Sequence, residues 1–139
     1  MVKKLSEDAI VPSYAHSGDS GMDLFANETA ELRPGERKMV RTGIAVAVPK
    51  GFEAQVRPKS GIALKDGISV LNTPGTVDSG YRGEVGVILI NLGSKAQKIE
   101  KGKKIAQMVI SRVEEASVEV VEELDETRRG SGGFGSTGV

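Results

Sequence analysis

The stretch that decides the fold is VGVILI, residues 85–90. It has the length of a strand and is apolar on both faces, so a strand made from it must be covered on both sides. The cover is either the second sheet of a β-sandwich or another subunit. The rest of the chain favours strands as well, because it contains 25 valine and isoleucine residues against eight leucines. Branched side chains of this kind fit a pleated surface better than a helix.

Turn signals recur at short intervals on either side of this stretch. Two runs between them, Ile44-Val46-Val48 and Phe52-Ala54-Val56, alternate as strands with one buried face. The one helix expected is a short turn at 60–65. Short strands punctuated in this way predict an all-β sandwich or barrel. The turn signals are RPG at 33–35, PKG at 49–51, KDG at 65–67, TPG at 73–75, NLG at 91–93 and KG at 101–102.

The bulk composition excludes several classes of protein. The chain has the length of one domain, with 139 residues, no cysteine and a single histidine. Thiolate nucleophiles, structural zinc sites and disulfide frameworks are therefore excluded. Its 19 basic and 19 acidic residues cancel, so no global charge favours nucleic acid. The N-terminus lacks the apolar run of a signal peptide and no stretch is long enough to span a membrane, so we expect a cytoplasmic protein without membrane contact.

The chain changes character near its C-terminus. Residues 114–126 carry seven acids and predict a helix or an exposed edge strand, or more simply a solvated face. After Thr127 the sequence becomes rich in glycine and serine, a composition typical of flexible segments. We therefore divide the chain into a β domain at 1–127 and a flexible arm at 128–139.

The arm has the composition of a nucleotide-binding segment. Its sequence RRGSGGFGSTG, residues 128–138, contains a G-x-G-x-x-G match, but only four residues follow Gly135, so no helix can complete a dinucleotide fold. Glycine and serine leave backbone N–H groups free for an anion, arginine adds a fixed charge and Phe134 offers a flat face to a base. A disordered terminus with a stray aromatic is the alternative. Twelve extended residues span roughly 40 Å, enough to reach a neighbouring chain.

Two further segments carry polar side chains beside turn residues. RPKSG, at 57–61, is not a P-loop because Pro58 stands where the motif needs glycine, but a hydroxyl at the start of a helical turn still suits a phosphate. NTPGTVDSGYRG, at 72–83, combines an amide, an acid and an aromatic in what we expect to be a rigid hairpin. An ordinary turn explains its glycines but not Asp78 and Tyr81 together.

Five segments together resemble one family, the trimeric deoxyuridine triphosphatases (dUTPases). They are GDSGMDL at 18–24, PKSGIA at 58–63, GTVDSGYRG at 75–83, GKKIAQM at 102–108 and RGSGGFGSTG at 129–138. Their order and spacing cover nearly the whole chain. The resemblance implies a jelly-roll-like β-sandwich subunit in a homotrimer, with three active sites at subunit interfaces. The arm of one subunit would close over a site formed by the other two.

The resemblance also implies a reaction and a set of roles. Water would attack the α-phosphorus of dUTP to give dUMP and pyrophosphate, with Mg²⁺ held mainly by the substrate phosphates and water and with Asp78 as the base. Asp23 would support the metal's hydration shell or the surroundings of Tyr81, unless it only braces a turn. The base and sugar would contact Asn72, Thr76, Val77, Tyr81, Gly86 and Phe134. The phosphates would contact Lys59, Ser60, Gly61, Gln107, Arg129, Gly135 and Ser136.

Selectivity follows from hydrogen-bond patterns and space. Uracil presents acceptor, donor and acceptor, which the Asn72 amide and nearby backbone groups can match, whereas cytosine would leave buried polar groups unpaired. A thymine methyl group would not fit, and Tyr81 packed under the sugar would exclude a ribose 2′-hydroxyl. Lys59 stands where the family usually has arginine, so we expect weaker or less well oriented phosphate binding.

Other interpretations remain open or are weak. A dCTP deaminase on the same fold would release ammonia from dCTP, and a non-catalytic relative would bind dUTP as a sensor. His16 suggests a hydrolase triad, but the chain lacks the G-x-S-x-G elbow. The sequon at 27–29 has no meaning in a cytoplasmic chain.

Overall fold

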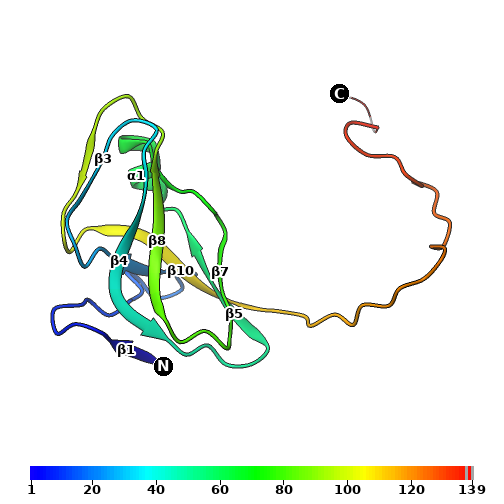
Figure 1. Ribbon diagram of the computed structural model, residues 1–139, viewed down its shortest axis with the longest axis horizontal. Coiled ribbons are helices and arrows are strands. Elements are labelled where there is room, and N and C mark those ends of the chain that lie inside the picture. The colour runs from blue at the N-terminus through cyan, green and yellow to red at the C-terminus, as the bar shows by residue number, and fades with distance from the viewer. Residues whose placement is uncertain (137, 139) are drawn as a thin grey trace.

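The computed structural model describes residues 1–136 and 138 (Figure 1). Thr137, part of the glycine-rich motif, and Val139 lie outside the described residues. The described part contains one helix, α1 (Ser60–Asp66), and strands that follow the predicted short spacing. The strands are β1 (Val2–Lys4), β2 (Met22–Phe25), β3 (Ala30–Leu32), β4 (Arg37–Val46), β5 (Phe52–Arg57), β6 (Ile68–Val70), β7 (Gly75–Val77), β8 (Glu84–Asn91), β9 (Gln97–Ile99) and β10 (Lys104–Arg112).

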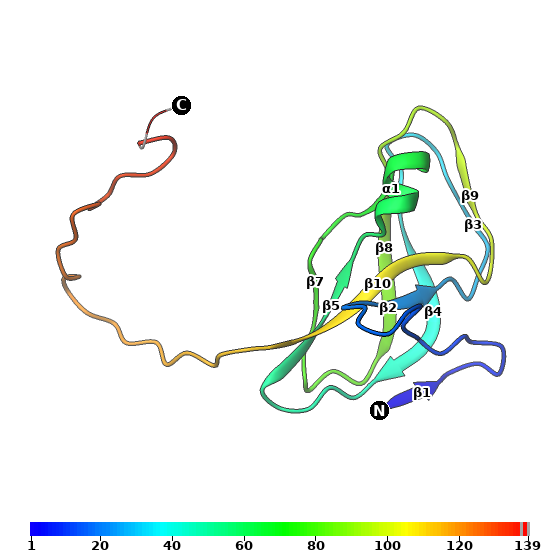
Figure 2. The same cartoon turned by 180° about the vertical axis from the view of Figure 1, so that it is seen from behind.

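The strands form two four-stranded sheets that pack against each other (Figure 2). One sheet has the order β1-β4-β8-β6 and the other the order β2-β10-β5-β7, while β3 and β9 pair separately. Every strand pair is antiparallel. The predicted all-β sandwich and its short helix are thus confirmed. Apolar side chains from both sheets enclose one core, which includes Leu24, Ile44, Val56, Ile68, Val87, Leu89, Ile105 and Met108.

The burial of β8 tests the prediction that the apolar stretch at 85–90 is covered on both faces. Val85, Val87 and Leu89 are buried in the core, as expected for a central strand. The opposite face, with Gly86, Ile88 and Ile90, is only half-buried within one chain. One sheet of the sandwich therefore covers one face, and the second face has apolar surface left for another contact.

Two local predictions need correction. The strand predicted at 44–48 extends back to Arg37 and ends at Val46. The segment 72–83 is not a hairpin, because β7 pairs with β5 in one sheet while β8 pairs with β4 and β6 in the other. Both edges of β8 are already hydrogen-bonded, so it has no edge left for β7. The segment instead crosses from one sheet to the other.

The chain leaves the sandwich after β10. Residues 114–126 form neither the predicted helix nor the edge strand, and they are exposed, in agreement with the simpler expectation of a solvated face. Seven like charges repel one another and give no apolar stripe to bury. The arm then extends away from the body in both views (Figures 1 and 2). Among the described residues, no helix is both long and apolar enough to cross a membrane.

Candidate active site

A small cavity gathers most of the residues predicted to bind a base and sugar. It has a volume of about 170 Å³ and lies where β7 ends and β8 begins, so both sheets contribute to it. Asp78 and Tyr81 come from the crossing segment between the two strands. The lining residues are Thr76, Val77, Asp78, Tyr81, Glu84, Val85 and Gly86. The cavity is smaller than the roughly 300–1,000 Å³ of a complete ligand site, so one chain's cavity can hold only part of a nucleotide.

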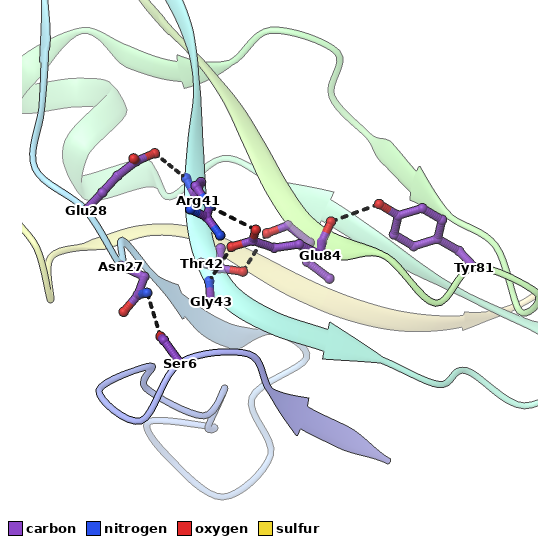
Figure 3. Close-up of polar contacts among 9 residues, drawn as sticks. Ser6, Asn27, Glu28, Arg41, Thr42, Gly43, Tyr81 and Glu84 are labelled. Atoms are coloured by element: carbon purple, nitrogen blue, oxygen red, sulfur yellow. Dashed lines mark hydrogen bonds and ion pairs between the residues drawn. The ribbon is translucent and has the colours of Figure 1, made fainter.

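Tyr81 is fixed in place although almost half of it is exposed. Its hydroxyl donates a hydrogen bond to the backbone carbonyl oxygen of Glu84, with an O–O distance of 2.9 Å (Figure 3). Its backbone N–H donates to the carbonyl oxygen of Asp78 at 3.1 Å. The turn therefore places the Asp78 carboxylate and the Tyr81 ring on the same cavity, with the carboxylate open to solvent.

Asn72 lies at the other end of β7 from Asp78. Its amide packs against Gly75, because a Cβ added to Gly75 would lie 3.2 Å from Asn72 Nδ2. Glycine at this position therefore lets the amide approach the strand backbone. Asn72 is exposed and does not line the cavity that holds Asp78 and Tyr81.

A second cluster contains residues predicted to bind phosphate. Lys59 is the N-cap of α1, with extended backbone angles and no side-chain capping bond, and Ser60 and Gly61 form the exposed first turn. Gln107 on β10 donates from Nε2 to the carbonyl oxygen of Pro58 at 2.9 Å. This bond ties the start of the helix to the sheet, so the two sequence motifs meet in the structure.

Asp23 holds two lysines beside this cluster. It is 4% exposed and pairs through Oδ1 with Lys59 and through Oδ2 with Lys104, the latter at 2.6 Å. Burial acts against the charged carboxylate, but the two ammonium groups outweigh burial and hold the pKa of Asp23 below its ordinary value. Asp23 thus orients Lys59 and Lys104. The hydrogen bond of the Tyr81 hydroxyl goes to Glu84 and not to Asp23.

The two clusters of one chain are well separated. The strand register pairs Gln107 with Arg57, whereas Val77 pairs with Ala54, three residues further along β5. With roughly 3.3 Å per residue and 4.8 Å between strands, the backbones of Gln107 and Val77 lie on the order of 14 Å apart. The strands of one chain therefore do not by themselves bring Asp78 next to Gln107.

The structure does not bring the predicted arm residues to either cluster. Phe134 is fully exposed. Arg129 donates from Nε to the carbonyl oxygen of Gly132 at 2.8 Å, and Ser136 donates its backbone N–H to Gly133. Gly135 has a φ of 93°, in the region that favours glycine. These hydrogen bonds join residues three apart and so close local turns. The described arm residues therefore contact neither cluster.

Three residues of this region escaped sequence reasoning. Lys104 was not expected at Asp23, although it lies within the GKKIAQM motif. Glu84 lines the cavity, and Gly83 lies directly against the Tyr81 ring. Lys104 and Gly83 lie within motifs, whereas the only sequence signal for Glu84 was an acid placed just before an apolar strand, which is too common a pattern to single out a residue.

Fold and clusters together define a β-sandwich protein with a cavity at Asp78 and Tyr81 and a separate polar cluster around Lys59 and Gln107. A model of the dUTPase family matches residues 7–138, and the chain belongs to this family. It is 61% identical to the deoxyuridine 5′-triphosphate nucleotidohydrolase of Clostridium novyi (strain NT) over 139 residues, which is 100% of this chain and 98% of the relative.

Solved dUTPases have the same fold. The enzyme of Staphylococcus bacteriophage 80alpha, solved with dUPNHPP, superposes with a TM-score of 0.92 at 30% identity and covers 100% of this chain and 98% of its own. A mutant dUTPase from phage phi11 of S. aureus, solved to show the coordination of a structural Mg(II) ion, has a TM-score of 0.84 at 27% identity. It covers 91% of this chain and 98% of its own.

Proposed function

We propose that this protein hydrolyses dUTP to dUMP and pyrophosphate by attack of water on the α-phosphorus. In a cytoplasmic setting this reaction limits uracil incorporation into DNA and supplies dUMP for thymidylate synthesis. One observation carries the proposal: in a dUTPase-family chain, a single cavity is lined by Asp78 and Tyr81 together with Thr76, Val77 and Gly86.

Asp78 is the general base of this proposal. A carboxylate open to the cavity can orient a water molecule and take its proton as the water attacks phosphorus. The remaining task is to place the triphosphate in line, which is a matter of position and charge. No covalent nucleophile is needed for such a reaction.

Thr76, Val77 and Gly86 form the proposed base pocket, and Asn72, at the other end of β7, is the proposed amide contact to the base. Backbone donors and acceptors of the crossing segment and the Asn72 amide match the acceptor, donor and acceptor of uracil. Cytosine reverses two of these groups and leaves buried polar atoms unpaired, which can cost roughly 10⁴-fold in specificity. A methyl group on the base is excluded by space in the narrow cavity.

Ser60, Gly61 and Gln107 are the proposed phosphate contacts, with Lys59 beside them. A hydroxyl and backbone N–H groups at an uncapped helix start suit an anion. The Lys59 ammonium group forms an ion pair with the Asp23 carboxylate. This pair would fix the position of the ammonium group before a phosphate binds.

Magnesium fits this donor set as an ion carried by the substrate. Asp23 is engaged by two lysines, and Glu84 by Gly43 and Arg41, which leaves Asp78 as the open carboxylate of the site. Mg²⁺ prefers phosphate oxygens, one or two carboxylates and several waters over a full protein cage. When bound, it neutralises charge on the phosphate oxygens.

A homotrimer with shared sites accounts for the separation within one chain. The Asp78 cavity of one subunit would meet the Gln107 cluster of another, which removes the separation of roughly 14 Å. The half-buried outer face of β8 and the exposed Met39 beside it offer apolar surface for such contacts. A closed ring of three identical subunits would then present three equivalent sites.

The arm at 128–139 is the proposed lid. Arg129 would bring charge to the phosphates, Gly135 and Ser136 would wrap them, and Phe134 would stack on the base. Ordering a glycine-rich segment costs about 1–2 kcal/mol per residue, so it should close only over a ligand that supplies many contacts.

The test is an assay of purified protein with Mg²⁺ and, separately, dUTP, dCTP, dTTP and UTP. Pyrophosphate from dUTP alone is the expected result. Ammonia from dCTP would identify the deaminase branch of the fold instead. Binding of dUTP without either product would support a sensor.

A further inference from the structure

The position of Tyr81 depends on a neighbour that has no side chain. The Tyr81 ring lies across Gly83, where an added Cβ would lie 2.3 Å from the hydroxyl oxygen and 2.6 Å from Cζ. Real Cβ atoms do not approach other atoms this closely, so any other residue at 83 must displace the ring. Gly83 has no left-handed φ, so the backbone itself does not require glycine there.

The acceptor of the Tyr81 hydroxyl is also held firmly. Glu84, whose carbonyl oxygen accepts that bond, has its carboxylate fixed at both oxygens (Figure 3). Oε1 accepts from the backbone N–H of Gly43 at 2.8 Å, and Oε2 accepts from Nε of Arg41 at 2.9 Å.

The anchoring groups belong to an irregular part of β4. The register between β4 and β8 shifts between Arg41 and Ala45, and Gly43 within this bulge has a φ of 69°. The bulge turns the Gly43 N–H toward Glu84 instead of a strand partner. Thr42 adds a hydroxyl bond to the carbonyl oxygen of Val85, so the start of β8 is tied to β4 at consecutive residues.

We propose that Gly83 and Glu84 are positioning residues that set the sugar specificity of the site. Gly83 provides the space for the Tyr81 ring, and Glu84 transmits the rigidity of the β4 bulge to the Tyr81 hydroxyl. This inference rests on the proposed function, because it specifies how the same site excludes a ribose 2′-hydroxyl.

To exclude a ribose 2′-hydroxyl, the Tyr81 ring must be held rigidly. Tyr81 is 45% exposed, and an exposed ring can rotate between side-chain rotamers unless something holds it. A movable ring would yield to one extra hydroxyl, because a site without a fixed wall discriminates against an added group by only about 10²-fold or less. A ring held at its hydroxyl and packed against Gly83 resists such movement.

The direct test compares two alanine variants of full-length protein from the same segment. Gly83→Ala should lower the ratio of kcat/KM for dUTP over UTP by roughly tenfold. Gly80→Ala is the matched control, because its added Cβ meets no atom within 4 Å and its φ is not left-handed. An unchanged dUTP/UTP ratio in Gly83→Ala would overturn the proposal.

A double-mutant cycle tests Glu84 without touching Gly83. Tyr81→Phe removes the hydroxyl, and Glu84→Gln replaces one acceptor of the carboxylate by a donor. If Glu84 acts through Tyr81, the dUTP/UTP ratio of the double variant should equal that of Tyr81→Phe alone. Additive losses would show that Glu84 has only a structural role and would contradict the proposal.

A fluorescence measurement separates this inference from the proposed function. The chain has two tyrosines and no tryptophan, so Tyr81 is the only tyrosine once Tyr14→Phe is introduced, and its emission can be excited selectively over that of phenylalanine. In that background, Gly83→Ala should at least double the acrylamide quenching of Tyr81, whereas Gly80→Ala should leave quenching unchanged. Equal quenching in the two variants would refute the claim that Gly83 holds the Tyr81 ring in place, even if the protein hydrolyses dUTP. Failure of the unmutated protein to release pyrophosphate from dUTP would refute the proposed function. The quenching result would still decide whether Gly83 holds the Tyr81 ring in place.

Discussion

The sandwich and the arm make binding surface in opposite ways. In the sandwich, buried side chains such as Val87 and Leu89 fix β8, which flanks the segment that carries Asp78 and Tyr81, so the cavity exists before any ligand arrives. In the arm, Phe134 is fully exposed and the hydrogen bonds of its neighbours are local. The difference teaches that the cavity at Asp78 and Tyr81 is preorganised, whereas the proposed lid would have to gain its order from a ligand. Each region should therefore respond differently to mutation.

The largest expected effect comes from the chemistry of the sandwich. Asp78→Asn keeps the shape of the turn but removes the base, so kcat for dUTP should fall by about 10²–10⁴-fold. The melting temperature should stay within a degree or two, because the side chain is exposed. Steady-state kinetics and thermal unfolding check both statements. Substantial remaining turnover would assign the base to another residue.

Removal of residues 128–139 is the matching change in the arm. We expect kcat/KM to fall by about 10²-fold, since loss of the contacts that position the triphosphate is costly even when the base is intact. The free energy of unfolding should not change, because the described arm residues make only local hydrogen bonds. Full activity of the truncated protein would remove the distinction between a preformed pocket and a ligand-ordered lid.

Asp23 tests the electrostatics of the sandwich. Its folded pKa lies below the ordinary value, so its charge stabilises the fold above the unfolded pKa, and this stabilisation disappears as the pH falls through the lower folded pKa. Asp23→Asn should cost about 1–2 kcal/mol near neutral pH, reduced by solvent screening at the half-exposed Lys104. The difference between the two proteins should shrink below about pH 4. Urea unfolding at several pH values measures it, and a difference independent of pH would contradict the ion-pair account.

The smallest expected effect is that of Lys59→Arg. Lys59 already pairs with Asp23 through its ammonium group. A guanidinium at this position can bind a phosphate through two parallel hydrogen bonds, which an ammonium group cannot do. KM for dUTP should fall by about two- to fivefold, within the energy of one improved charged contact. Unchanged kcat and KM would show that Lys59 does not limit phosphate binding.

The sequence predicted much of the sandwich because its signals are local. Alternation at 52–56, the apolar run at 85–90 and the turn at 60–65 each specify one element, and all three are present. The crossing segment at 72–83 was misread as a hairpin, because turn residues do not reveal that β8 already has partners on both edges.

The site was predictable to the extent that motifs carry it. Five residues that the family resemblance singled out, Thr76, Val77, Asp78, Tyr81 and Gly86, line one cavity, while their roles stay predictions. Lys104 and Glu84 were missed, since their contacts with Asp23 and Gly43 cross between strands far apart in sequence. Such contacts depend on strand register and on a β-bulge, neither of which is visible in a single sequence.

The most direct test of the central claim is complementation between two inactive proteins. Asp78→Asn at full length supplies arms, and a chain ending at residue 127 supplies Asp78. If each site takes its base and its arm from different subunits, random mixed trimers should recover about a quarter of the wild-type sites. No recovery in trimers shown by mass spectrometry to contain both chains would contradict the account and place the base and the arm of each site on one chain.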